Sequence, residues 1–176
     1  MTTSTKENAM TLNHNHYPVA LFSEILPNLF QGGTDDNDVI HIAHSSYKRR
    51  SDMPFDSIIT MYAWARPADW NVQELRYGIP DNLISDIDLN RLRKAVDFAH
   101  QQWKSGDRVL IRCQAGLNRS GLVTALVLIK EGYSPDQAID LIRAHRGEDA
   151  LCNSHFEQWL LTSAASFINP PSSLSA

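Results

Sequence analysis

The sequence has few cysteines, no excess of basic charge and no long apolar run, and each shortage excludes a class of protein. Two cysteines among 176 residues cannot form the disulfide framework that supports many small secreted domains. No apolar run reaches the roughly 18 residues that a membrane-spanning helix needs. A net charge of -4 gives no overall attraction to nucleic acid or to an anionic membrane, so any affinity for phosphate has to be local.

The two ends of the chain are polar and are expected to lie outside the folded domain. Residues 1–16 lack the apolar core of a secretory signal, so we expect a cytoplasmic protein that does not associate with membranes. His14 and His16 are too few to hold a metal, and neither a metal nor another cofactor is expected. The length predicts one domain, over residues 19–167, with disordered tails at 1–18 and 168–176.

The most informative stretch is a short loop between a predicted strand at 109–112 and an apolar predicted helix at 122–129. The loop runs from Cys113 to Arg119 through Gln114, Ala115, Gly116, Leu117 and Asn118. Its backbone N–H groups, at the start of a helix, are expected to form a concave nest for phosphoryl oxygens. Arg119 can hold two of those oxygens with its planar guanidinium. The same positive charge favours the nucleophilic thiolate of Cys113, and Ser120 can donate a hydrogen bond to that sulfur.

This loop, from Cys113 to Gly121, resembles the signature loop of the cysteine-based protein tyrosine phosphatases. The sequence around it resembles their compact dual-specificity branch, and the resemblance extends over roughly residues 26–161. Strands are predicted as a pair within 25–33 and at 55–61, 74–79 and 109–112, and helices within 35–47, from Ser85, at 122–129, from Ser134 and from Ser154. We therefore expect a single α/β domain with a short, mostly parallel sheet, helices on both faces, and the Cys113 loop at the carboxyl edge.

Breaking a phosphate ester requires a proton for a poor leaving group, and three aspartates are candidates for supplying it. Asp86 and Asp88 fall in a pattern typical of a helix N-terminus, in which Ser85 is the cap, so a structural role explains them. Asp81 has no such role, and it lies 32 residues before Cys113, similar to the general acid of dual-specificity phosphatases. The resemblance therefore implies that Asp81 is the general acid, with Asp86 as the second choice.

Four further residues are candidates for supporting the site. Trp64 and Arg66 follow a predicted strand, and both are candidates for holding the substrate. In the simpler interpretation, Trp64 packs on the core and Arg66 faces solvent. Asn153 matches a position where the family often has an Asn that reaches the loop serine, here Ser120. Arg112 stands where the family usually has His, and its charge beside the thiol is expected to favour the thiolate.

Three residues near the C-terminus have alternative interpretations. Arg143 and Arg146 lie in a stretch similar to an Ile-Arg-x-x-Arg pattern common in the family, which implies structural pairing in preference to a second phosphate site. Cys152 is interpreted as a small buried residue, with a redox partnership with Cys113 as the less favoured alternative.

The resemblance implies a phosphatase that acts on phosphotyrosine, and on phosphoserine or phosphothreonine, in proteins or peptides through a phosphocysteine intermediate. Gln114 and Leu117 stand where lipid phosphatases of the superfamily carry Lys, which argues against phosphoinositides. Residues 118–121 also resemble the Asn-Arg-Thr-Gly of RNA 5′-triphosphatases, but Asp81 and the acidic balance disfavour nucleic acid. A phosphate-binding module with little turnover is the other alternative, and Arg119 followed by Ser120 disfavours a sulfurtransferase.

Overall fold

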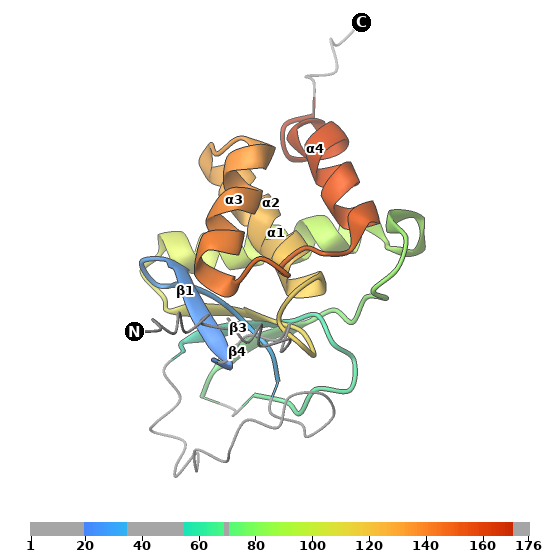
Figure 1. The fold of residues 1–176 in the computed structure, drawn as a ribbon. Helices are drawn as coiled ribbons and strands as arrows, with labels where there is room; N and C mark the ends of the chain where they lie inside the picture. Colours follow the sequence, from blue (N-terminus) through green and yellow to red (C-terminus); the bar gives the residue numbers. More distant parts are fainter. Residues whose placement is uncertain (1–19, 35–54, 69–70, 171–176) are drawn as a thin grey trace, which may run out of the picture.

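The computed structural model describes residues 20–34, 55–68 and 71–170, which form one α/β domain (Figure 1). Its five strands make one sheet in the order β1-β2-β5-β3-β4. The first pair is antiparallel and the other three pairs are parallel, which confirms the predicted mostly parallel sheet. The strands are β1 (Phe22–Leu26), β2 (Leu29–Gly32), β3 (Ser57–Thr60), β4 (Gln73–Arg76) and β5 (Val109–Arg112).

The central strand, β5, is buried on both faces of the sheet. Val109 and Ile111 pack into the large core beneath the helices, whereas Leu110 packs on the opposite face with Phe30 and Ile58. Side chains alternate across a strand, so a strand covered on both sides has to be apolar at every position that the core encloses. The continuous apolar run before Cys113 is the sequence signature of this placement.

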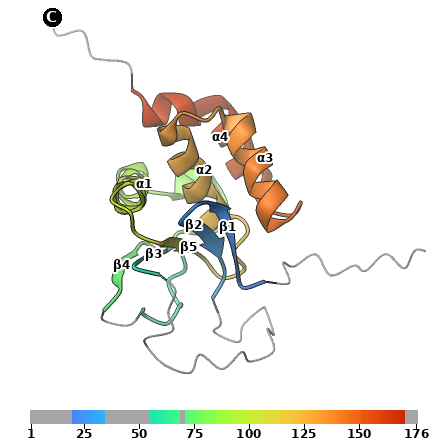
Figure 2. The ribbon, with the colours of Figure 1, turned by 90° about the vertical axis from the view of Figure 1, so that its left-hand side faces the viewer.

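Four helices cover one face of the sheet in the described part of the chain (Figure 2). They are α1 (Leu89–Lys104), α2 (Arg119–Glu131), α3 (Pro135–Arg146) and α4 (Ser154–Ile168). The central one, α2, packs against the other three and is buried from Ser120 to Ile129, which explains its apolar sequence. A helix that is apolar all round needs such a fully enclosed position.

Helices were expected on both faces, but the four described helices all lie on the same one. The opposite face carries an aromatic cluster in which Phe22, Phe30 and Phe55 meet edge to face at centroid distances of 4.9–6.0 Å. The helix predicted within 35–47, the whole of the first tail and residues 171–176 of the second lie outside the described residues. Helix α4 reaches Ile168, the first residue of the predicted second tail.

Two helix boundaries follow the sequence signals closely. Gly132 ends α2 in the left-handed conformation with φ of 114°, as a C-terminal glycine does. Ser134 caps α3 through a reciprocal pair of hydrogen bonds with Gln137, at 3.2 Å and 2.9 Å. Both confirm the predicted caps.

The cap of α1 lies three residues later than predicted. Asp88, and not Ser85, caps α1 by accepting hydrogen bonds from the N–H groups of Asn90 and Arg91. Residues Ile84–Asp86 instead form a separate short 3-10 helix, η2. The hydroxyl of Tyr77 accepts from the Asp88 N–H at 3.0 Å and so fixes the start of α1 after that turn. A bond to Tyr77, which follows β4 and lies 11 residues before Asp88, is not visible in the local capping pattern.

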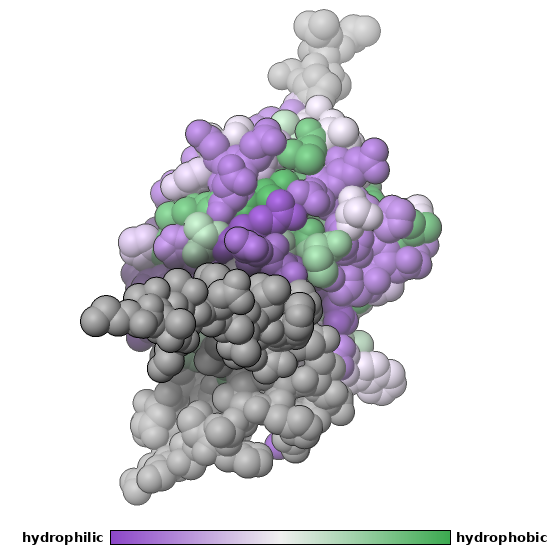
Figure 3. Space-filling model, in the orientation of Figure 1, coloured by the Kyte–Doolittle hydropathy of each residue, from purple (hydrophilic) through white to green (hydrophobic). Residues whose placement is uncertain are grey.

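No described helix is both long enough and apolar enough to cross a bilayer. The face shown in Figure 3 is mostly hydrophilic where the described helices lie, with apolar side chains scattered between polar ones.

Candidate active site

The predicted loop joins β5 to α2 and places Cys113 at its floor. The Cys113 side chain is 2% exposed, and its backbone N–H donates to the carbonyl of Gly32 at 3.1 Å. The sulfur lies 3.3 Å from the hydroxyl oxygen of buried Ser120, in the first turn of α2. The hydroxyl of Ser120 can therefore donate to a thiolate at this position, as predicted from its place after Arg119.

Side chains behind the loop hold its carbonyl oxygens and thereby orient its N–H groups. Gln31 donates to the carbonyls of Gly116 and Leu117 at 3.1 Å and 3.4 Å, and Arg146 donates to those of Ala115 and Gly116 at 3.3 Å and 3.0 Å. In a trans peptide the C=O of one residue and the N–H of the next point in opposite directions. The N–H groups of residues 116–118 therefore point away from Gln31 and Arg146, which forms the predicted concave nest.

Glycine is required at position 116 of this loop. Its φ is +74°, and a Cβ there would lie 2.3 Å from the backbone of Gly32 and 2.6 Å from Nη2 of Arg146. No other residue type fits both the backbone angle and the space.

Arg146 is a second guanidinium near the sulfur of Cys113. It is 3% exposed and also donates to the carbonyls of Ala20 and Leu21, at 2.8 Å and 3.1 Å, which ties the chain before β1 to the loop. Burial lowers the pKa of Arg146 to about 10, while the charge of a Cys113 thiolate opposes that shift. Arg146 thus stays charged at neutral pH and supports the loop from behind, as the structural interpretation predicted.

Arg112 does not lie beside the thiol, so that prediction is wrong. Successive side chains of β5 alternate, and Arg112 points to the face opposite Cys113. There its guanidinium donates to the hydroxyl of Thr60 at 2.9 Å, to the carbonyl of Arg66 at 2.6 Å and to the carboxylate of Glu74 at 3.1 Å. Arg112 is therefore one half of a buried ion pair.

Glu74 is the other half of this ion pair, and its pKa is lowered below the ordinary value of 4.5. Burial acts to raise the pKa, but hydrogen bonds from Thr60 and Ala68 and the charge of Arg112 outweigh it. A carboxylate whose pKa is lower in the folded than in the unfolded state stabilises the fold above the unfolded pKa. Its contribution is lost as the pH falls below about 4.5 towards the folded pKa.

We expect the change Glu74→Gln to lower the free energy of unfolding at pH 7 by about 3 kcal/mol, because it leaves the Arg112 charge buried without its partner. Urea denaturation measures this loss, and the difference from the unsubstituted protein should shrink below pH 4.5. The exposed pair of Asp97 and Lys130 provides a control, since Asp97→Asn should cost under about 1 kcal/mol. Equal losses in the two variants would show that the buried pair has no special role.

The same network shapes the segment after β3, where Trp64 and Arg66 were predicted to lie near the site. Arg112 and Arg76 donate to the carbonyls of Arg66 and Ala65, both at 2.6 Å. The segment turns the ring of Tyr62 against the guanidinium of Arg119, at 5.1 Å from its centroid. Trp64 is 81% exposed, so the interpretation that it packs on the core is wrong. Substrate contact by Trp64 or by the exposed Arg66 stays a prediction.

Arg119 has one buried nitrogen that no described residue satisfies. Its Nη2 lies 3.4 Å from Oε1 of Gln114, but its buried Nε has no hydrogen-bond acceptor among the described residues. Oδ2 of Asp81 forms an ion pair with Arg119, but it lies 3.9 Å from Nε, which is too far for a hydrogen bond. A buried donor without an acceptor is costly, and a bound group that supplied an acceptor would remove this cost.

Of the three candidate acids, Asp81 is the one that lies at the loop. Asp86 accepts from Asn82 at 2.9 Å and Asp88 is itself the cap of α1, so both have structural roles, although not the expected places in a helix capped by Ser85. Asp81 faces Arg119 and accepts a hydrogen bond from the side chain of Asn118 at 3.2 Å. Its assignment as the general acid stays a prediction, which this position supports.

Asn153 approaches Asp81 and not Ser120, so its predicted partner was wrong. Its Oδ1 caps α4 by accepting from the N–H groups of His155 and Phe156, a role that was predicted for Ser154. Its Nδ2 donates to Oδ1 of Asp81 at 2.8 Å. The cap position turns this side chain towards the loop of Asp81 and Asn82, which we call the acid loop after the predicted acid. It turns the side chain away from Ser120, which follows the loop from Cys113 to Arg119, the predicted phosphate loop.

The segment before α4 is fixed by Arg143. This residue donates to the carbonyl of Ala150 at 3.2 Å and pairs with Glu157 at 2.9 Å, which is the structural pairing that was expected. Cys152 is exposed, with its sulfur 3.4 Å from Oδ1 of Asn118, so its interpretation as a buried residue is wrong.

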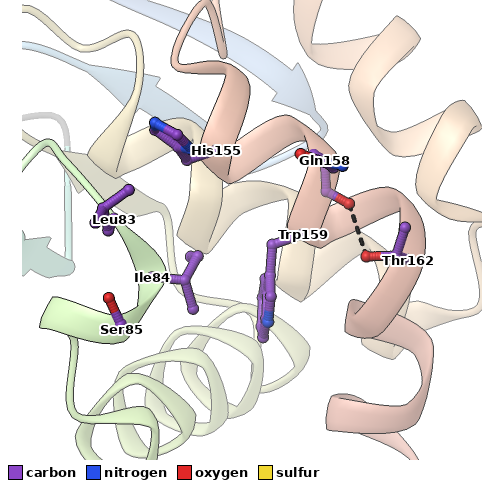
Figure 4. A pocket seen from close by; sticks show the side chains of 7 residues that line it. All are labelled: Leu83, Ile84, Ser85, His155, Gln158, Trp159 and Thr162. Carbon is purple, nitrogen blue, oxygen red and sulfur yellow. Dashed lines mark hydrogen bonds between the residues drawn. The ribbon is translucent and has the colours of Figure 1, made fainter.

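Two hollows lie at the start of α4 and share His155, and Asp81 lines one of them. A polar one of about 470 Å³ lies between the acid loop and the start of α4, and Asp81, Asn118 and Asn153 help line it. A second one, of about 330 Å³, lies between η2 and α4 (Figure 4). There Leu83 and Ile84 approach from η2 and its preceding residue, and Trp159 approaches from α4. In the part of the chain that the structure describes, no group of three His, Cys, Asp or Glu residues is placed to hold a metal.

The site thus combines three parts: a buried thiol, a loop that carries an arginine and a nest of backbone N–H groups, and a carboxylate at the loop's edge. The family model of the dual specificity phosphatase catalytic domain matches residues 44–165 of the chain. The putative tyrosine phosphatase 123R of Invertebrate iridescent virus 6 is 27% identical over 125 residues, which are 70% of this chain and 79% of the viral protein.

Two solved structures show the same fold. Human DUSP28 superposes with a TM-score of 0.66 at 20% identity, over 82% of this chain and 93% of that one. A mouse putative dual specificity phosphatase, solved with zinc tungstate, gives a TM-score of 0.62 at 21% identity, over 90% of this chain and 92% of the other. With most of its length matched by the family model, the chain belongs to the dual-specificity phosphatase family.

Proposed function

We propose that the protein hydrolyses phosphomonoesters in proteins or peptides, with phosphotyrosine as a substrate and phosphoserine or phosphothreonine as others, through a phosphocysteine intermediate. The observation that carries the proposal is the buried Nε of Arg119, which lacks an acceptor among the described residues and lies beside Asp81. A phosphoryl oxygen in the loop would satisfy this donor, and a second oxygen would meet the Nη2 group. Asp81 then stands where a leaving oxygen needs a proton.

In the first step, the thiolate of Cys113 attacks phosphorus in line with the leaving oxygen. The new S–P bond forms as the P–O bond to the substrate breaks, and Asp81 gives its proton to the departing oxygen. Arg119 and the N–H groups of the loop stabilise the negative charge on the three equatorial oxygens.

In the second step, water replaces the sulfur at phosphorus. Asp81, now a carboxylate, takes a proton from that water as its oxygen bonds to phosphorus and the S–P bond breaks. The sulfur leaves as a thiolate, and Ser120 stabilises it by donating a hydrogen bond across the 3.3 Å that separate the two atoms. Inorganic phosphate is released and the site returns to its starting state.

We expect the change Asp81→Asn to lower kcat on a phosphotyrosine peptide by about 10²- to 10³-fold, because the phenol is a poor leaving group without a proton. The loss should be smaller on p-nitrophenyl phosphate, whose leaving group needs less assistance. Release of inorganic phosphate measures both rates, and the matched variant Asp86→Asn should keep both near the original values.

The same phosphate-release assay distinguishes the alternative functions when it is run on the peptide and on triphosphorylated RNA, each with and without a chelator. An RNA 5′-triphosphatase would act on triphosphorylated RNA in preference to the peptide, with little dependence on Asp81. A binding module would release no phosphate from either substrate. Either result, or a strict need for a divalent ion, would contradict the proposal.

A further inference from the structure

We propose that Asn118 and Asn153 act together as positioning residues that hold the Asp81 carboxylate at the phosphate loop before substrate arrives. We call this pair of side chains the amide clamp. The inference rests on the proposed function, because it assigns Asp81 the role of general acid, and it identifies what places that acid.

The clamp contacts both oxygens of the carboxylate. Nδ2 of Asn153 donates to Oδ1 of Asp81 at 2.8 Å, and Nδ2 of Asn118 donates to Oδ2 at 3.2 Å. The two asparagines are joined to each other, since Oδ1 of Asn118 accepts from the backbone N–H of Asn153 at 3.0 Å. Three segments that are distant in the sequence, the acid loop, the phosphate loop and the start of α4, are thereby linked.

Asp81 needs such support because its own loop does not fix it. Its side chain is 35% exposed, and an exposed carboxylate on a loop has several rotamers available. With Oδ1 held by Asn153, the other oxygen, Oδ2, faces Asn118 and Arg119. Oδ2 lies 3.9 Å from Nε of Arg119 and is the oxygen to which the proposed first step assigns the proton.

Both asparagines use their side chains in ways that helix capping does not explain. Asn118 stands at the cap position of α2 but makes no capping hydrogen bond with its side chain. Asn153 does cap α4, but only its Oδ1 is needed for that, and its Nδ2 is directed to Asp81 and to the carbonyl of Asn82 at 3.1 Å. Ser and Asp cap a helix as well as Asn does, but neither would supply the amide donor that reaches Asp81.

This double role of Asn153 allows a test that leaves the helix cap intact. The variants Asn153→Ser and Asn153→Asp both keep a capping oxygen for α4, but both remove the amide donor to Asp81. The second variant also adds a negative charge that faces the Asp81 carboxylate. We expect kcat on a phosphotyrosine peptide to fall about 10-fold in Asn153→Ser and about 100-fold in Asn153→Asp, because small displacements of a catalytic group are costly. KM should change little, since neither substitution touches the phosphate-binding groups.

The readout that separates positioning from general damage is the leaving group. The loss in both variants should be several-fold smaller on p-nitrophenyl phosphate than on the peptide. Neither Asn153→Ser nor Asn153→Asp should lower the rate further in the Asp81→Asn background. Asn153 acts through Asp81, so its effect is lost once the acid itself is absent. The variant Ser134→Ala, which removes the side-chain cap of α3, should lower the melting temperature without changing the ratio of the two rates.

Three outcomes would overturn the clamp. They are equal losses on both substrates, an undiminished loss in the Asp81→Asn background, and an unchanged rate in Asn153→Asp. Failure of the proposed function looks different, because the unsubstituted protein would then release no phosphate or Asp81→Asn would have no effect.

Discussion

Replacing Cys113 with serine is expected to lower kcat on a phosphotyrosine peptide by more than about 10⁴-fold, because a serine hydroxyl is not ionised at neutral pH and is a far weaker nucleophile. The substitution changes one atom at a site that is buried and enclosed by the loop, so the fold and the binding of phosphate should persist. Phosphate release measures the loss, and inorganic phosphate should still raise the melting temperature of the variant.

The protein provides its own matched control for this substitution. Cys152 is exposed, and a serine hydroxyl there can also donate to Oδ1 of Asn118, so Cys152→Ser should keep most of the activity. If Cys113→Ser retained more than a tenth of the original rate, or if Cys152→Ser lost as much, then Cys113 would not be the nucleophile.

The change Arg119→Lys is expected to lower kcat by about 10³-fold although the positive charge is kept. A lysine ammonium cannot present two parallel N–H groups to two phosphoryl oxygens, and it removes the buried Nε that lacks an acceptor among the described residues. The contact of the guanidinium with the ring of Tyr62, which holds it in place, is weakened as well.

A second arginine on an aromatic ring provides the control for this variant. Arg93 lies 4.2 Å from the centroid of Phe167 on the surface of the helical layer, so Arg93→Lys should leave the rate within about twofold. Steady-state assays on the peptide compare the two variants directly. A rate for Arg119→Lys within tenfold of the original would contradict the account of phosphate binding by the planar guanidinium.

The strand, the loop and the buried helix were predictable because each is encoded locally. The apolar run before Cys113, the glycine at position 116 and the cap pair of Ser134 and Gln137 all specify their own backbone conformations through neighbours in the sequence. The structure confirms the sheet and these helix boundaries, and the family model confirms the resemblance on which the fold depended.

The errors concern side chains whose partners come from distant segments. Arg112 was expected beside the thiol, but the alternation of side chains along β5 directs it to the other face of the sheet, where it pairs with Glu74, 38 residues earlier. Arg146, 30 residues after Gly116, supports the loop instead, and only the folded chain brings the two together. The sequence shows that two arginines, Arg112 and Arg146, are available to support the loop, but it does not show which of them contacts it.

Asn153 illustrates the same limit for the acid loop. The resemblance directed attention to this residue but assigned it to Ser120, whereas its amide donates to Asp81, 72 residues away. The one-residue shift of the helix cap from Ser154 to Asn153 changes where the side chain points. Cap positions are uncertain by a residue or two in any sequence-based prediction, and here that uncertainty reaches the site.

The covalent intermediate on Cys113 tests the account most directly. The protein is mixed with excess phosphotyrosine peptide, quenched during turnover, digested and examined by mass spectrometry. We predict a phosphoryl group on the peptide that contains Cys113, with more of it in the Asp81→Asn variant on p-nitrophenyl phosphate, because the second step loses its base. Turnover without any phosphoryl group on Cys113 under both conditions, or with the group on another residue, would contradict the account.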